Sequence, residues 1–506
     1  MRPPLDAHCP RTYLAHASQL ILSASLRIYR QKPRASSQYA SAPSSTADSK
    51  QMMAINTTLR TLRTTTALLS ALHISACGVG GAGGDESENA DLSESQLASA
   101  QCSIESMRSW AYDNMKSYYL FADQVSPNVQ LSDYDSAEEL VTALRVQPFD
   151  RFSNIQDQST QAAFFNEGEN FGFGWRLIFN TEGEIVVSFI EPGSPLDLAG
   201  IQRGDVLVSL DGYSTEEYLA LPTETRLNIL GTGTAITSPT LGFRKSNGFI
   251  QEQVVTKATF SMQTVTNVKA IDHAGTRVGY LSFYQFVETS KTELANAFAT
   301  LANESITELV LDLRFNGGGR ISVANELASY IVGDNGTDQV FSSIIFNDAN
   351  SDNNSSAVFE PVSNALNLSR VYVLAGPGTC SASEMVINGL SPFVEVVIVG
   401  ESTCGKPYGT RAVNRCGKSM NAVEVEFQNA NGFGGYYEGF DADCSVSDSF
   451  SAALGSSSES LFATALDHIS TGSCNVLATG PASRNSVFDS PKLPDELKPP
   501  VISDKL

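Results

Sequence analysis

The chain has 506 residues, of which 42% are hydrophobic and 17% charged, so it can build packed cores and is long enough for two to four domains. Residues 1–76 carry nine Lys and Arg against two Asp and Glu, whereas the remainder carries 24 against 53, a formal charge of −29. Such an acidic surface repels phosphate backbones, which argues against nucleic acid as a partner.

A targeting pattern follows an internal methionine near the start of the chain. Arg60 and Arg63 precede an apolar run over 66–76, which is too short to span a bilayer but fits the core of a secretory signal. Cys77 follows small residues and resembles the acylated cysteine of a bacterial lipobox; a plain signal peptide with an unrelated cysteine is the alternative. We therefore expect residues 1–76 to be a leader with a lipoprotein-type signal, and the protein to be exported to the bacterial periplasm or cell envelope with a lipid anchor as its only membrane contact.

The cysteines are interpreted in the light of export. Residues 77–101 are rich in Gly, Ser and acidic side chains and predict a flexible tether. Six cysteines follow, an even number in a compartment that permits disulfides, and no zinc-type spacing occurs, so no metal is expected. Among the many possible pairings we expect Cys404 with Cys416 first, because the loop between them is short and rich in turn residues. The six are Cys102, Cys380, Cys404, Cys416, Cys444 and Cys474.

Three folded units are predicted in chain order. Apolar residues at helical spacing predict a small helical domain over 102–165. Short strands and turns alternate over 166–260, which predicts a β-rich domain. Buried strands alternate with helices over 261–475, which predicts an α/β domain with a largely parallel sheet. The tail over 476–506, rich in Pro, Ser and Lys, is expected to be disordered.

The β-rich domain resembles a PDZ domain. NFGFGWRL, the strand VVSFI and PGSPLDLAGIQRGDVLVSLDG have the order and spacing of that fold. The resemblance implies that a polypeptide C-terminus binds there as an added strand, with Gly172, Phe173 and Gly174 in the position of the loop that cradles the carboxylate. The alternative is a rigid spacer or lid.

A nucleophilic serine needs a base to take its proton. Only two histidines follow Cys77, His273 in a turn and His468 in a terminal helix, and both fit surface or packing roles, so a Ser-His-Asp triad is poorly supported. A lysine can replace histidine where a dry, apolar setting lowers its pKa from about 10.4. Lys406, in TCGKPYG after the apolar strand VEVVIVG, has such a setting.

Ser381 begins the helical pattern SASEMVINGL, directly after the strand VYVLAG and the turn GPGT. A strand-turn-helix corner exposes a nucleophile and directs N–H groups at a reacting carbonyl, although a serine there could equally be a helix cap. The glycine run 317–319 follows the strand ELVLDLRF. Its backbone can approach a substrate closely and offer N–H donors to an oxyanion, and a simple tight turn is the alternative.

GYLSF, ELVLDLRFNGGG, GTCSASEM and GESTCGKPYG together resemble the C-terminal processing, or tail-specific, peptidase family of serine proteases, over roughly residues 102–475. The resemblance implies a crotonase-like core, Ser381 as the nucleophile and Lys406, 25 positions later, as the general base. It also implies an oxyanion hole formed by the backbone N–H groups of Gly318 and Ala382, and no cofactor.

Two positions depart from the family. Some members carry an acidic residue where Pro392 stands and a glutamine where Thr410 stands. The expected function is an exported serine endopeptidase that cleaves polypeptides with a Ser/Lys dyad and recognises substrate C-termini through the PDZ-like domain. The alternatives are a catalytically inactive, PDZ-containing peptide-binding lipoprotein and an α/β acyl-CoA enzyme.

Overall fold

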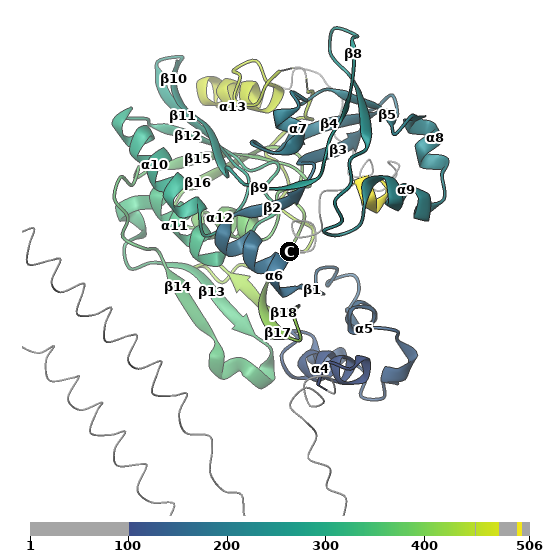
Figure 1. Cartoon of the computed structure of the whole chain (residues 1–506). Coiled ribbons are helices and arrows are strands. Elements are labelled where there is room, and N and C mark those ends of the chain that lie inside the picture. The colour runs from purple at the N-terminus through teal and green to yellow at the C-terminus, as the bar shows by residue number, and fades with distance from the viewer. Residues whose placement is uncertain (1–100, 451, 475–492, 498–506) are drawn as a thin grey trace, which may run out of the picture. The chain divides into compact units, whose positions relative to one another are not determined.

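The computed structural model describes residues 101–450, 452–474 and 493–497 (Figure 1). Cys77, the leader and all of the tether except Gln101 lie outside the described residues, so the signal and lipidation expectations stay predictions. Within the described ranges, no helix is both long and apolar enough to cross a bilayer.

The N-terminal unit contains two helices, α4 (Ile104–Ser117) and α5 (Ala137–Leu144), and each is preceded by a serine whose side chain accepts a hydrogen bond from a helix N–H. The strand β1 (Asn154–Asp157) follows and pairs antiparallel with β18 (Lys418–Gln428). The region 102–165, predicted as a helical domain, also contains a strand, and β1 belongs to a sheet built mostly by the C-terminal half of the chain. Short helical segments complete this region: η1 (Ala122–Gln124), η2 (Leu131–Asp133), α6 (Gln158–Ala162) and η3 (Ala163–Glu167).

A second sheet, with its own apolar core, forms what we call the β-rich unit. Its strands are antiparallel, and α7, α8 and α9 pack with them. In spatial order the strands are β3 (Trp175–Phe179), β4 (Ile185–Ile190), β5 (Val206–Leu210), β7 (Thr240–Arg244) and β8 (Ile250–Val254), with β6 (Tyr213–Ser214) beside β5. The helices are α7 (Pro195–Leu198), α8 (Thr215–Ala220) and α9 (Thr223–Leu230). A separate pair, β2 (Glu169–Gly172) with β9 (Ala258–Ser261), lies where the chain enters and leaves the unit.

The central sheet carries the candidate site. It runs β10 (Val265–His273), β11 (Thr276–Phe283), β12 (Glu308–Asp312), β15 (Arg370–Ala375), β16 (Glu395–Gly400) and β19 (Cys444–Ser445). The first pair is antiparallel and the other four pairs are parallel. Helices α10 (Ser290–Asn303), α11 (Ile321–Val332) and α12 (Ala382–Leu390) cover one face, and α13 (Ser460–Thr471) covers the other (Figure 1).

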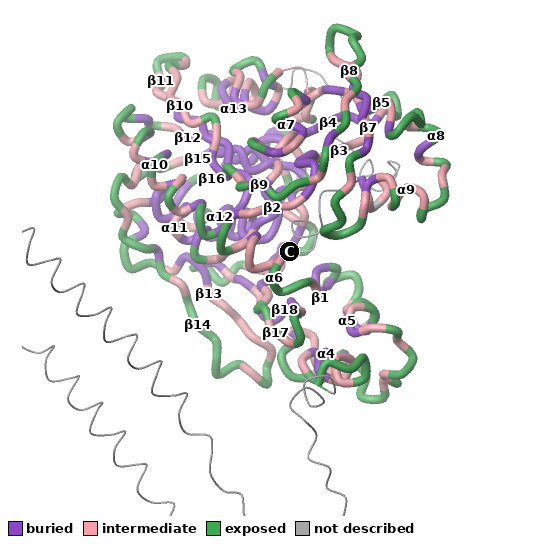
Figure 2. Tube along the Cα trace, in the orientation of Figure 1, coloured by how far each residue is buried: buried purple, intermediate pink, exposed green. Residues whose placement is uncertain are grey.

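Burial of this sheet on both faces explains the unbroken apolar runs of its strands. Leu309 and Leu311 belong to the cluster under α10 to α12, whereas Val310 and Tyr372 belong to the cluster under α13. All four are fully buried, and Figure 2 shows this sheet as the buried interior.

An antiparallel sheet joins the N-terminal unit to the rest. Its order is β1, β18, β13 (Val340–Phe346) and β14 (Ser355–Val358), and β17 (Tyr408–Arg415) also pairs with β18. The apolar cluster of α4 and α5 continues into β17 and β18. The remaining short helices are η4 (Gly333–Gly336), η5 (Asp348–Asn353) and η6 (Asp495–Leu497).

The expected Cys404–Cys416 disulfide is wrong. The structure pairs Cys102 with Cys416, Cys380 with Cys404, and Cys444 with Cys474. The eleven positions between the two expected partners are largely the extended strand β17, which at about 3.3 Å per residue carries Cys416 away to the tip of the β17–β18 hairpin.

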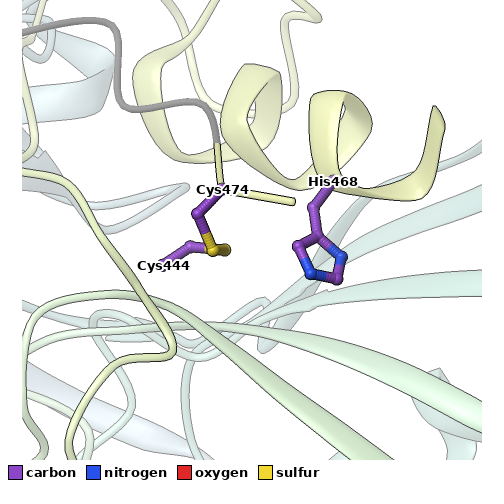
Figure 3. Close-up of side chains that lie close together, drawn as sticks. All are labelled: Cys444, His468 and Cys474. Carbon is purple, nitrogen blue, oxygen red and sulfur yellow. A yellow bond between two sulfur atoms is a disulfide. The ribbon is translucent and has the colours of Figure 1, made fainter. Parts of the chain in front are cut away.

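Figure 3 shows the Cys444–Cys474 disulfide beside His468 of α13. The two sulfurs and a ring nitrogen of His468 lie within 4.8 Å of one another. Both sulfurs are committed to the disulfide, so neither is the thiolate that a metal requires. His468 Nδ1 instead lies 2.9 Å from the hydroxyl of Tyr372, a packing role that fits the sequence expectation for this histidine.

Part of the tail is ordered, contrary to the prediction of disorder over 476–506. Residues 493–497 include η6, and Leu497 is fully buried in the core of the β-rich unit. The composition of the whole tail predicted disorder, but Leu497 and Leu493 bury apolar surface against the β-rich unit, and this burial stabilises the segment.

A buried ion pair fixes the end of β12. The guanidinium of Arg314, 4% exposed, donates to Asp312 at 2.9 Å and to both carboxylate oxygens of Glu459 at 2.7 and 2.8 Å. Glu459 also accepts hydrogen bonds from the first turn of α13. One carboxylate therefore joins α13 to the strand end that precedes the glycine loop.

We predict that Glu459→Ala lowers the free energy of unfolding by about 3 kcal/mol, because it removes the bidentate partner of a buried guanidinium. Glu395→Ala is the matched control, since that carboxylate is 61% exposed and 3.8 Å from Arg370, and should cost less than about 1 kcal/mol. Urea titration measures both, and equal effects would contradict the assignment.

Candidate active site

Ser381 stands at the corner between β15 and α12. It is the N-cap residue of α12 and has φ +56° and ψ −112°, a conformation that residues with a side chain rarely adopt. The residue is 9% exposed. The turn thus holds this serine in a strained geometry at the carboxyl end of a parallel strand, the end where open α/β sheets place their ligands.

The glycine loop lies against this corner. A Cβ built on Gly318, which has φ +105°, would stand 2.8 Å from the Cβ of Ser381, so only glycine fits. The carbonyl of Asn316 accepts hydrogen bonds from the Cys380 N–H at 3.1 Å and the Ser383 hydroxyl at 2.9 Å. These contacts bring together two of the sequence motifs, the glycine run and S-A-S-E.

The N–H groups of Gly318 and Ala382, the two expected oxyanion donors, differ in whether they already donate a hydrogen bond. The Gly318 N–H donates to the side-chain oxygen of Asn316 at 2.9 Å. Among the described residues, no acceptor is bonded to the Ala382 N–H, the first of α12. Ala382 is therefore the available donor, and Gly318 can contribute only by sharing or exchanging its bond to Asn316.

Lys406 lies between β16 and β17 and is 1% exposed. Its Nζ is 5.0 Å from the centre of the Phe152 ring. Burial lowers the pKa of this lysine to about 7; the negative charges of Asp150 and Glu384 act in the opposite direction, and Arg151 assists burial. Near neutral pH the amine is thus divided between its protonated form and its neutral, basic form.

Glu384 connects the serine segment to the lysine segment. Its carboxylate accepts hydrogen bonds from the backbone N–H groups of Ser381 at 2.9 Å, Gly405 at 2.7 Å and Lys406 at 2.8 Å, and from the Thr403 hydroxyl at 2.6 Å. Burial raises the pKa of Glu384 while these donors lower it. The Cys380–Cys404 disulfide joins the same two segments covalently, one residue before Ser381 and two before Lys406.

Sequence reasoning missed the contribution of the N-terminal unit. Asp150 is fully buried and accepts hydrogen bonds from Tyr119 at 2.8 Å and from the backbone of Phe152 and Ser153. Phe152 is buried against Lys406. The pair Asp150-Arg151 between two phenylalanines in PFDRF was the available sign, because a charged side chain needs internal partners once it is buried.

Ser381, Ala382 and Lys406 line one hollow of about 360 Å³. Thr410 also lines it, in the position where some relatives were expected to carry glutamine, whereas Pro392 does not. Further lining comes from Gly319, Ile321, Met385, Tyr408, Gly409 and Phe427. The mainly apolar wall keeps the amine poorly solvated.

Gly172, Phe173 and Gly174 do not belong to this hollow. They connect β2 to β3 in the β-rich unit, where the Phe173 carbonyl accepts a hydrogen bond from the Leu196 N–H. Gly174 has φ +83°, and a Cβ there would meet the Ser194 side chain at 2.0 Å. The loop is thus packed tightly against α7.

We predict that Lys406→Met raises the free energy of unfolding at pH 7 by roughly 4 kcal/mol. The folded-state pKa of about 7 lies below the usual 10.5, so the unfolded chain binds the proton more tightly and the lysine destabilises the fold at neutral pH. The difference from wild type should be largest at and below pH 7 and shrink as pH rises to about 10.5. Lys291→Met, at a side chain 34% exposed, is the control and should change stability by less than about 1 kcal/mol. A pH-independent difference for Lys406→Met would contradict the depressed pKa.

The family model for peptidase family S41 matches residues 277–430, and that for the peptidase S41 N-terminal domain matches residues 106–154. A carboxyl-terminal-processing protease of Picosynechococcus is 28% identical over 274 residues, which cover 54% of this chain and 63% of the relative. One from Synechocystis is 27% identical over 300 residues, covering 54% and 61%.

The chain thus spans less than two thirds of the length of these curated relatives. Among solved structures, an S41 protease from Bacteroides fragilis is similar in fold, with a TM-score of 0.59 at 22% identity over 72% of this chain and 97% of that one. The mixed α/β content of the central domain is the S41 protease fold. The two family matches, together with the curated relatives, make the chain similar to peptidase family S41 over its N-terminal unit and much of its central domain.

Proposed function

We propose that the protein is a serine endopeptidase in which Ser381 is the nucleophile and Lys406 the general base. The observation that carries the proposal is a lysine 1% exposed, with a pKa of about 7, lining the same hollow as a strained serine at a strand-turn-helix corner. A base works best when its pKa is near the operating pH, and desolvation is the route by which lysine reaches it.

The reaction begins when neutral Lys406 takes the hydroxyl proton of Ser381 as its oxygen attacks a peptide carbonyl. The new C–O bond gives a tetrahedral oxyanion, which the Ala382 N–H stabilises, with Gly318 as a second donor when it shares its bond to Asn316. Collapse expels the amine, which takes the proton from Lys406. Water, deprotonated by Lys406, then releases the acyl group and restores the serine.

The substrates are polypeptides, and we propose that the β-rich unit acts as a PDZ domain that recognises their C-termini. The support is its strand order, an edge strand β3 preceded by the Gly172–Gly174 loop, and the names of the curated relatives as carboxyl-terminal-processing proteases. Three disulfides agree with an oxidising compartment. We therefore propose an exported enzyme of the bacterial periplasm or cell envelope, anchored by lipid at Cys77.

We predict that Ser381→Ala and Lys406→Ala each abolish cleavage of an unstructured polypeptide such as casein. In the wild type, kcat/KM should rise with pH through about 7, because only the neutral amine accepts a proton. A serine-reactive acylating probe should label Ser381 in the wild type and fail on Ser381→Ala. Retained cleavage in both variants would refute the dyad, and absence of labelling would indicate an inactive peptide-binding protein.

We also predict that replacing both Cys380 and Cys404 by serine lowers kcat by at least about tenfold, since small displacements of a nucleophile from its base are costly. Cys102→Ser with Cys416→Ser is the matched control. That disulfide is exposed at the hairpin tip, so its loss should lower the thermal midpoint and leave kcat within about twofold. Equal kcat values for the two double variants would show that the Cys380–Cys404 link does not position the site.

A further inference from the structure

The segment 493–497, Leu-Pro-Asp-Glu-Leu, is bound to the β-rich unit. Its short helix η6 contacts α9 of that unit (Figure 1). Leu497 is fully buried, in the apolar cluster that includes Phe173, Trp175 and Leu230. Leu493 packs against the same cluster and is partly buried. Two leucines four positions apart thus attach this piece of the tail.

A charge pair accompanies the leucines. Glu496 lies 2.6 Å from Arg226 on α9, and the two side chains are only 3% and 15% exposed. Arg226 Nε and Glu496 Oε1 attract each other as opposite charges, although the geometry between them is not that of a hydrogen bond. Arg226 is held in place by a second contact, a hydrogen bond of 2.9 Å to the Leu219 carbonyl. The contact site therefore selects for an acidic residue next to a leucine, since a carboxylate compensates the buried guanidinium.

The segment lies against a helix and shares its apolar cluster with the start of an edge strand. Strand β3 is at the edge of its sheet, and in the described part of the chain it pairs only with β4. The Phe173 side chain, from the loop before β3, belongs to the same cluster as Leu497. An edge strand, a helix and apolar side chains are the elements with which domains bind extended or short helical segments.

We propose that the α9 face of the β-rich unit is a binding site for peptide segments in which an acidic residue precedes leucine, and that the chain's own residues 493–497 occupy it as an intramolecular competitor. A tethered segment competes at an effective concentration on the order of millimolar, so it lowers the apparent affinity for any external peptide by the fraction of time it is bound. The external occupants rest on the proposed function, as tails of substrate polypeptides with the same acidic-leucine pattern. The binding of the tail itself does not depend on catalysis.

The test uses the full chain in the Ser381→Ala background, which separates binding from proteolysis. The probe is a fluorescein-labelled peptide with the sequence of residues 491–500, PKLPDELKPP, followed by fluorescence anisotropy. Glu496→Arg and Leu497→Asp should each release the tail and tighten probe binding by at least tenfold. The matched control is Glu216→Arg, the same charge change at an exposed position of α8, and should leave the Kd unchanged.

The pairing itself is tested by reversing the other charge. In the Leu497→Asp chain, whose tail is released while Glu496 is kept, a further Arg226→Glu change should weaken binding of the acidic probe at least tenfold. The doubly changed chain should instead bind a probe that carries arginine at the Glu496 position. A Kd that neither tail variant changes, or a probe that binds equally with glutamate at position 226, would overturn the proposal. If the wild-type enzyme then failed to cleave any polypeptide while these binding shifts held, the proposed activity would fall and the binding site would stand.

Discussion

Desolvation of one amine is the constraint on which the rest of the site depends. A lysine with a pKa near 7 exists only where water is excluded, and the exclusion here comes from three parts of the chain. Phe152 belongs to the N-terminal unit, Tyr408 begins β17, and Met385 lies in α12; all three lie at Lys406 or line the hollow that contains it. The antiparallel sheet through β1 and β18 is what holds the first of these against the second.

Different chain segments position the Ser381 hydroxyl and the Lys406 amine, and both segments are hydrogen-bonded to Glu384. The buried carboxylate accepts hydrogen bonds from the main chain at Ser381 and at Lys406, so it fixes the two segments relative to each other. The Cys380–Cys404 disulfide repeats the same connection covalently. On the opposite side, Asn316 fixes the glycine loop against the serine corner through its carbonyl. The strain stored at Ser381 persists because all of these contacts determine its position together.

Residues whose role depends on local pattern could be predicted from the sequence, and residues whose role depends on distant contacts could not. Ser381 and the glycine run follow apolar strands, so their place at strand ends was readable, as was the mixed α/β content. The Cys404–Cys416 expectation failed because loop length says nothing about an intervening strand. Phe152 lies more than 250 positions before Lys406, and no periodicity relates the two. The ordered piece at 493–497 was hidden because two leucines in a polar tail bind only where another unit supplies a complementary surface.

The Cys102–Cys416 disulfide joins positions 314 residues apart. Both ends of this long segment must be present before the setting that buries Lys406 can form. A nascent chain that has not yet delivered the β17–β18 hairpin has no strand on which β1 can pair, so Phe152 has no surface to cover. Its Lys406 remains in water with the ordinary amine pKa of about 10.4 and is fully protonated, so it lacks the neutral form that the proposed reaction needs. Chains that lack this hairpin therefore lack the buried, low-pKa amine on which the proposed reaction depends.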